Sequence, residues 1–196
     1  MHPFMTEQIA KDRRARLRKQ ADDARLAAAA TSGCPAKAAR VRLRPLDLAD
    51  LKNIATLFDR LSLRSRYLRF MSRRVVAPST VLYFAAVDHD RHEAVGAFDG
   101  ERLVGSAHYF RSGEDATEAE IAAEVIDRYQ GKGIGSCLLR ELARLARPRG
   151  ISHFSATVLA ENAAALALLH KSGWPAATHQ DGPELAITAT INGIPL

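Results

Sequence analysis

From residue 41 onward, the pattern of hydrophobic and polar positions predicts short strands and amphipathic helices. Residues 41–45 alternate and end at a proline, as a short strand does. Apolar side chains then recur at helical spacing over 48–61, directly after Asp47, which suits a helix N-cap. Asp99-Gly100 is a strong two-residue hairpin signal. The other expected elements are strands at 94–98, 102–110, 120–126, 154–159 and 184–191, and helices at 63–71, 134–147 and 162–171.

The order of these elements is that of a mixed α/β or α+β layer. Helix 134–147 has Pro148 and Gly150 after it, and helix 162–171 is closed by Gly173, a residue suited to the C′ position. We therefore expect a mixed central sheet of six to seven strands, flanked by about four helices.

Composition then narrows the class of protein. A chain of 196 residues suits one compact domain plus an appendage, and 47% hydrophobic with 26% charged residues is ordinary for a globular protein. No apolar run approaches the roughly 18 residues of a membrane span, and no secretory h-region begins the chain. The two cysteines are far apart and form no CxxC pair. We expect a cytoplasmic protein without a membrane partner.

The net charge of +6 is concentrated in an N-terminal arm. Residues 1–40 hold nine Lys or Arg and four Asp or Glu, which leaves 19 and 18 for the rest of the chain. We expect a helical or disordered basic arm at 1–39 and a folded domain at 40–196. The arm has no aromatic residues between its basic ones to stack on bases, which argues against a nucleic-acid partner.

A glycine-rich loop between strand 120–126 and helix 134–147 has the chemistry of an anion site. Glycines stand at 131, 133 and 135, and glycine lets backbone N–H groups approach and converge on a ligand. The helix N-terminus adds unpaired N–H groups and the positive end of the helix dipole. A Walker A loop is excluded because no earlier glycine is correctly placed, and a Rossmann fingerprint because the loop follows several strands instead of the first.

The residues Gln130-x-x-Gly133-x-Gly135 resemble the [QR]-x-x-G-x-[GA] signature of the GNAT family of acyl-CoA N-acyltransferases. Val125 lies five residues before Gln130, as in the family's longer pattern. Downstream, Asn162 and the helix that ends before Gly173-Trp174 resemble the second half of the family. The resemblance covers about three-quarters of the chain, from strand 41–45 to strand 184–191.

The resemblance implies a GNAT fold, with the sheet splayed between its fourth and fifth strands and acetyl-CoA in the gap as co-substrate, without a metal. The pyrophosphate is expected on the loop N–H groups and the pantetheine arm along the end of strand 120–126. Asn162 is suited to hydrogen-bond the cofactor, although it also suits a helix N-cap. The expected cofactor-binding residues are Val125, Ile126, Gln130, Gly131, Lys132, Gly133, Ile134, Gly135, Ser136 and Asn162.

Amide formation from a thioester needs a base for the amine and donors for the oxyanion. Glu120 and Glu124 lie on one face of the same strand, and position relative to the loop favours Glu120 as the general base of the family. The backbone N–H near Val125, where family members have a bulge, is expected to bind the oxyanion. Leu169 stands where many members carry a tyrosine acid, which leaves the acid unassigned.

The segment 61–70 resembles the L-S-x-x-S-x-Y-x-R-F segment of the bacterial protein-lysine acetyltransferase subgroup, in which it borders the acceptor groove. A protein lysine is therefore the expected acceptor. Two alternatives stay open: a small-molecule amine as the acceptor, and a non-catalytic acyl-CoA-binding module. The sequence does not determine the oligomeric state.

Overall fold

The computed structural model describes residues 41–111, 113 and 116–192, so the basic arm expected at 1–39 lies outside the described residues. The strands are β1 (Arg42–Pro45), β2 (His92–Asp99), β3 (Arg102–Arg111), β4 (Glu118–Val125), β5 (His153–Leu159), β6 (Ala176–Asp181) and β7 (Glu184–Thr190). The α-helices are α2 (Leu51–Asp59), α3 (Leu63–Phe70), α4 (Pro78–Ala85), α5 (Ile134–Ala146) and α6 (Ala163–Ser172).

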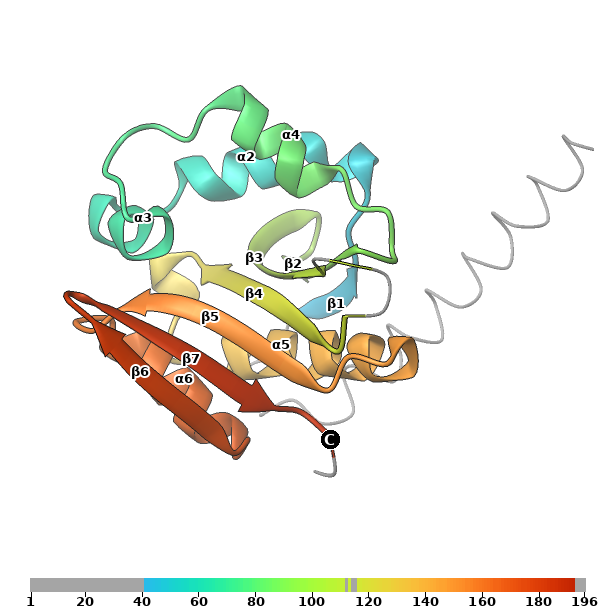
Figure 1. The fold of residues 1–196 in the computed structure, drawn as a ribbon. Helices are drawn as coiled ribbons and strands as arrows, with labels where there is room; N and C mark the ends of the chain where they lie inside the picture. Colours follow the sequence, from blue (N-terminus) through green and yellow to red (C-terminus); the bar gives the residue numbers. More distant parts are fainter. Residues whose placement is uncertain (1–40, 112, 114–115, 193–196) are drawn as a thin grey trace, which may run out of the picture.

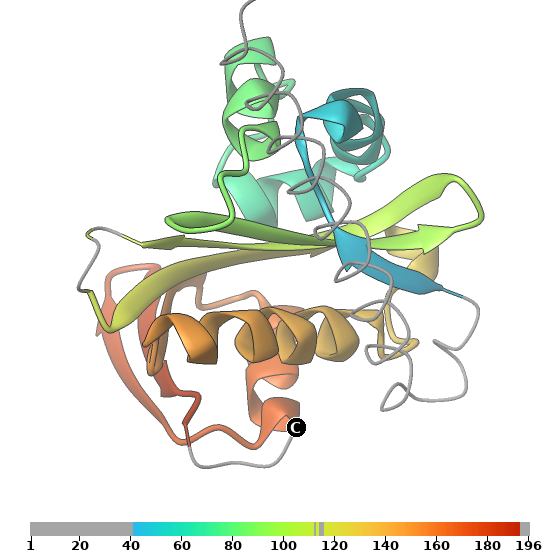
Figure 2. The ribbon, with the colours of Figure 1, turned by 90° about the vertical axis from the view of Figure 1, so that its right-hand side faces the viewer.

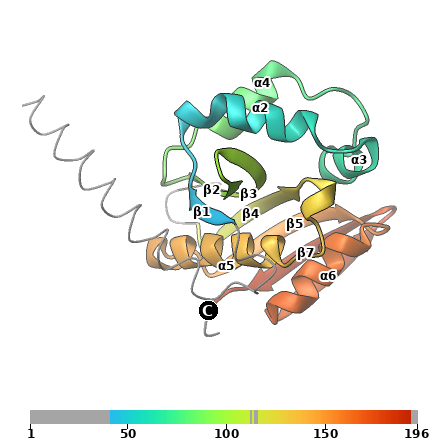
Figure 3. The same ribbon diagram turned by 180° about the vertical axis from the view of Figure 1, so that it is seen from behind.

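The described strands form one seven-stranded sheet in the order β1-β2-β3-β4-β5-β7-β6. Helices α2, α3 and α4 lie on one face of this sheet and α5 and α6 on the other (Figure 1), and Figure 3 shows α5 and α6 from behind. Seen nearly edge-on, the sheet separates the two helical layers (Figure 2). The apolar stripe of α5 packs fully buried beneath the sheet through Leu138, Leu142 and Ala146.

The sheet is interrupted between β4 and β5, its one parallel pair. The two strands are paired only where Glu118–Glu120 meets His153–Ser155, whereas β3 and β4 are paired from Gly105/Val125 to Arg111/Ala119. The C-terminal halves of β4 and β5 therefore diverge, as the expected splay requires. The gap opens at the end of β4, next to the glycine loop.

The structure confirms the fold class and adds two elements that the sequence pattern did not predict. Among the described residues there are five α-helices instead of about four, because α4 forms at Pro78–Ala85, and β6 pairs with β7 at the edge of the sheet. Asp47 acts as an N-cap, but of a short 3-10 turn at Leu48–Asp50 that leads into α2. In this part of the chain, no helix has the length and apolarity needed to cross a bilayer.

Candidate functional site

In the gap between β4 and β5, backbone N–H and C=O groups of β4 are no longer paired with β5. Ile126 donates its N–H to the carbonyl of Val104 on β3. Since N–H groups alternate sides along a strand, those of Ala123 and Val125, beyond the last β4–β5 pair at Glu120/Ser155, point away from β3 and toward the gap. The β3–β4 register runs unbroken to Val125, so the expected bulge is absent from this pairing. Val125 nevertheless presents an N–H to the gap by alternation alone.

The glycine loop turns directly from β4 into α5. Gly131 and Gly133 have φ angles of 68° and 88°, which only glycine adopts at little cost. Gly133 is also the N-cap of α5, and no side chain caps this helix. By contrast, the side chains of Ser62 and Asn162 cap α3 and α6. The first-turn N–H groups of α5, at Ile134, Gly135 and Ser136, therefore remain for an anion.

Gln130 fixes the end of β4. Its side-chain amide donates to the carbonyl of Val125 at 2.8 Å and to the hydroxyl of Ser65 at 3.3 Å. This side chain therefore satisfies a carbonyl that β5 no longer reaches, and it ties the loop to α3.

Asp127 makes a second tie to the same helix. Its carboxylate accepts hydrogen bonds from the hydroxyls of Ser62, at 2.7 Å, and Ser65, at 2.9 Å. Burial opposes the charged form of Asp127, but the hydrogen bonds from Ser62 and Ser65 outweigh it and lower the pKa of the carboxyl. The start of α3 is thereby held beside the glycine loop.

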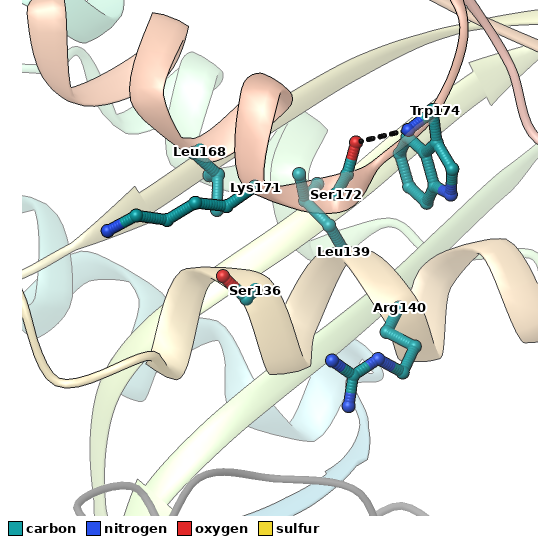
Figure 4. Close-up of a pocket in the computed structure, with 7 residues that line it drawn as sticks. All are labelled: Ser136, Leu139, Arg140, Leu168, Lys171, Ser172 and Trp174. Atoms are coloured by element: carbon teal, nitrogen blue, oxygen red, sulfur yellow. Dashed lines mark hydrogen bonds between the residues drawn. The ribbon is translucent and has the colours of Figure 1, made fainter.

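Positive charge flanks the loop and the groove between α5 and α6. The ammonium of Lys132 lies 5.0 Å from the ring centroid of Tyr129, which places it on the loop surface. A small pocket between the two helices is lined by Ser136, Lys171 and Trp174, among others. In Figure 4 the Lys171 side chain extends over Ser136 toward the beginning of α5. Both cations therefore lie near the uncapped N-terminus.

Helix α6 follows β5 and packs against α5. Asn162 caps it, accepting from the backbone N–H of Ala165 at 3.1 Å, so the N-cap role of this residue is observed. A Cβ atom at Gly135 would lie 3.3 Å from Leu168, which shows how closely α5 and α6 approach. Leu169 is only half-buried, and no residue of α6 is fully buried.

The two candidate glutamates have different environments. The Glu124 side chain is 2% exposed and forms an ion pair with Arg69, with Nε and Oε2 2.6 Å apart. The hydroxyl of Ser106 donates to its other oxygen. Glu124 is therefore already committed to partners that stabilise its charge, which makes it a poor base.

Glu120 is exposed on the same face, two pleats away, and has no hydrogen-bond or ion-pair partner in the described part of the chain. It stands at the last paired position before the gap, opposite Ser155 of β5. An unpaired carboxylate at the mouth of the gap is free to accept a proton from a ligand.

A buried polar cluster behind Glu124 was not predicted from the sequence. His108 is fully buried, 3.2 Å from the Ser106 hydroxyl and 3.1 Å from His92. Burial, together with the nearby charges of His92 and Arg69, lowers the pKa of His108 well below its ordinary value. The partner of Glu124, Arg69, lies 55 positions away in the chain, and no local pattern signals that pairing.

Among the described residues, no group of His, Cys, Asp or Glu is arranged to hold a metal.

Known proteins resemble this chain in sequence. The family model described as "Acetyltransferase (GNAT) family" matches residues 60–174. Acetyltransferase Pat of Mycolicibacterium smegmatis is 32% identical over 133 residues, 67% of this chain and 40% of that protein. Acetyltransferase PA5475 of Pseudomonas aeruginosa is 30% identical over 129 residues, 63% of this chain and 69% of that protein. The chain thus spans well under half the length of the mycobacterial relative.

Solved structures show the same fold. The GNAT domain of S. lividans PAT superposes with a TM-score of 0.71 at 27% identity, covering 76% of this chain and 89% of that one. An N-acetyltransferase from Thermoplasma acidophilum, solved in complex with coenzyme A, has a TM-score of 0.64 at 20% identity and covers 76% of this chain and 98% of its own. The second likeness concerns the fold alone.

Proposed function

Since the chain belongs to the acetyltransferase (GNAT) family, we propose that it transfers an acetyl group from acetyl-CoA to the primary amine of a protein lysine, with Glu120 as general base. The observation that carries this proposal is the contrast between the two glutamates on β4. Glu124 is paired and enclosed, whereas Glu120 is exposed and unpaired at the mouth of the gap.

The cofactor fits the geometry of the gap and the loop. The pyrophosphate binds the N–H groups at the uncapped start of α5, with Gln130, Gly131, Lys132, Gly133, Ile134, Gly135 and Ser136 around it. The end of β4, at Val125 and Ile126, would border the pantetheine arm in the gap between β4 and β5. Asn162 borders it from the start of α6. The half-buried face of α6 is then covered by the cofactor.

The chemistry is a direct attack. Glu120 takes a proton from the acceptor ammonium, the neutral nitrogen attacks the thioester carbonyl, and the N–H of Val125 stabilises the oxyanion. The C–N bond forms, the C–S bond breaks, and coenzyme A leaves as the thiolate. The nitrogen then loses its second proton, which passes through water to the thiolate and gives coenzyme A as the thiol. Leu169 supplies no proton, and a thiolate is a leaving group stable enough to depart before it is protonated.

The lysine acceptor is supported by the segment 61–70, which resembles that of the protein-lysine acetyltransferase subgroup. M. smegmatis Pat and S. lividans PAT are similar to this chain at 32% and 27% identity. The segment 61–70 has the subgroup pattern and is tied to the site by Asp127, Gln130 and Glu124. A small-molecule amine is the second candidate, because the exposed position of Glu120 suits any primary amine.

Release of free thiol from acetyl-CoA in the presence of a lysine-rich protein mixture tests the proposal. Glu120→Gln keeps the shape and removes the base, so we expect a fall in turnover of about a hundredfold. Glu118→Gln, on the same face of β4 and also exposed, is the matched control and should stay near wild type. Binding of coenzyme A without turnover on any amine would instead indicate a non-catalytic module.

A further inference from the structure

A row of three side chains crosses the sheet at Glu120. In the strand registers, His92 of β2 pairs with Phe110 of β3, and Phe110 pairs with Glu120 of β4. Because paired residues point to the same face, all three side chains lie on the face covered by α4. The rings of His92 and Phe110 stack, with centroids 4.3 Å apart and planes at 27°. Glu120 therefore lies at the open end of an aromatic row.

Tyr83 of α4 lies over this row. Its ring stacks on Phe110 with centroids 5.1 Å apart and planes at 12°, and on His92 at 6.1 Å and 17°. The edge of Phe84 meets it from the same helix, with centroids 5.6 Å apart at 84°. Three aromatic side chains thus hold Tyr83 in one orientation, although 57% of the residue is exposed. An exposed ring this firmly held is a preformed contact surface.

The electrostatics of the surface favour a cation. Burial, and secondly the negative charge of Glu120, raise the pKa of Tyr83, so the two side chains are near enough to interact. The guanidinium of Arg69, on the same face of the sheet, is already paired with Glu124. An unpaired carboxylate beside the exposed ring of Tyr83 complements a positive group on an apolar stem.

We propose that Tyr83 and Phe110 form the aromatic wall of the acceptor site, which binds the alkylammonium side chain of the acceptor and delivers its nitrogen to Glu120. This assignment rests on the proposed function and specifies how that site selects its substrate. The wall contacts the methylene stem and the ammonium, so it selects a long, flexible primary amine such as lysine. Tyr83 acts as a specificity residue, and Glu120 remains the base.

The test uses the pentapeptide acetyl-Gly-Gly-Lys-Gly-Gly-amide at saturating acetyl-CoA. Tyr83→Ala should raise the acceptor KM about tenfold, the size of one partly desolvated cation–π contact, and leave the KM for acetyl-CoA within about twofold. Tyr83→Phe retains the ring and should restore most of the loss. Leu82→Ala, the neighbouring position on α4 with 51% of the residue exposed, is the matched control.

A second measurement is independent of turnover. Calorimetric titration of the same peptide into the protein saturated with free coenzyme A gives the affinity of the dead-end complex, which should weaken about tenfold in Tyr83→Ala. If the wild-type protein turns over the peptide, and Tyr83→Ala has the same peptide KM and affinity, the aromatic wall alone is overturned. A rise of the acetyl-CoA KM without a rise of the peptide KM overturns it as well. Tyr83-dependent binding without turnover contradicts the proposed reaction alone. If the protein shows neither peptide binding nor turnover, both the aromatic wall and the proposed reaction are overturned.

Discussion

Removing the charge of Arg69 should destabilise the domain strongly, because it leaves Glu124 buried without its counter-charge. The Glu124 side chain is 2% exposed, and the Arg69 side chain that covers it is 16% exposed, with 2.6 Å between Nε and Oε2. Loss of one partner from such a pair costs about 3–5 kcal/mol. The Ser106 hydroxyl still donates to the carboxylate, so we expect the lower end, about 3 kcal/mol, for Arg69→Met.

Urea denaturation at pH 7 measures this change, and a thermal scan should show a loss of about 6–12 °C for a domain of this size. Adding Glu124→Gln to Arg69→Met removes the isolated charge and should recover at least about 1 kcal/mol. Arg64→Met, at an exposed position of the same helix, should change little. An Arg69→Met protein within about 1 kcal/mol of wild type would refute the view that this pair anchors α3 to the sheet.

Two further predictions concern the loop and the buried histidines. Gly131→Ala and Gly182→Ala both force a side chain into left-handed backbone with open space around it, at φ 68° and 55°. Each variant should lose about 1 kcal/mol of stability, but only Gly131→Ala should weaken coenzyme A binding in a titration. Equal affinities of the two variants for coenzyme A would contradict the loop assignment. His108 has a pKa well below that of an unfolded histidine, so the folded state binds fewer protons below pH 6.5 and stability should fall as the pH is lowered from 7 to 5. In His108→Gln this fall should be smaller by about 2 kcal/mol, and identical slopes in urea titrations would show that His108 is not the group responsible.

Most of the fold could be predicted because the apolar residues repeat at the period of each element. Helix α5 is the clearest case, with its apolar stripe buried beneath the sheet and its end near Pro148. Helix α4 was missed because its apolar part, Val81–Ala85, is short and continuous, so periodicity does not distinguish a helix from a strand. Strand β6 was missed because it is exposed along its length and forms only by pairing with β7.

Part of the candidate site could likewise be predicted from the sequence, and part could not. The glycine loop could be found from sequence because positive φ angles require glycine at Gly131 and Gly133. Strand alternation could not separate Glu120 from Glu124, since both occupy the same face of β4, and only the distance from the loop favoured Glu120. The pairing of Glu124 could not be predicted, because Arg69 reaches it only after α3 has packed on the sheet. Likewise, Tyr83 joins Phe110 across a chain separation that leaves no local pattern.

The central claim is that a protein lysine receives the acetyl group with Glu120 as the base. The most direct measurement is mass spectrometry of a deacetylase-free cell lysate, incubated with isotopically labelled acetyl-CoA and either the wild-type protein or Glu120→Gln. We expect labelled acetyl groups on a defined set of lysines with wild type, reduced about a hundredfold with the variant. Labelled lysines of equal abundance with both proteins, or label found solely on small amines, would contradict the claim.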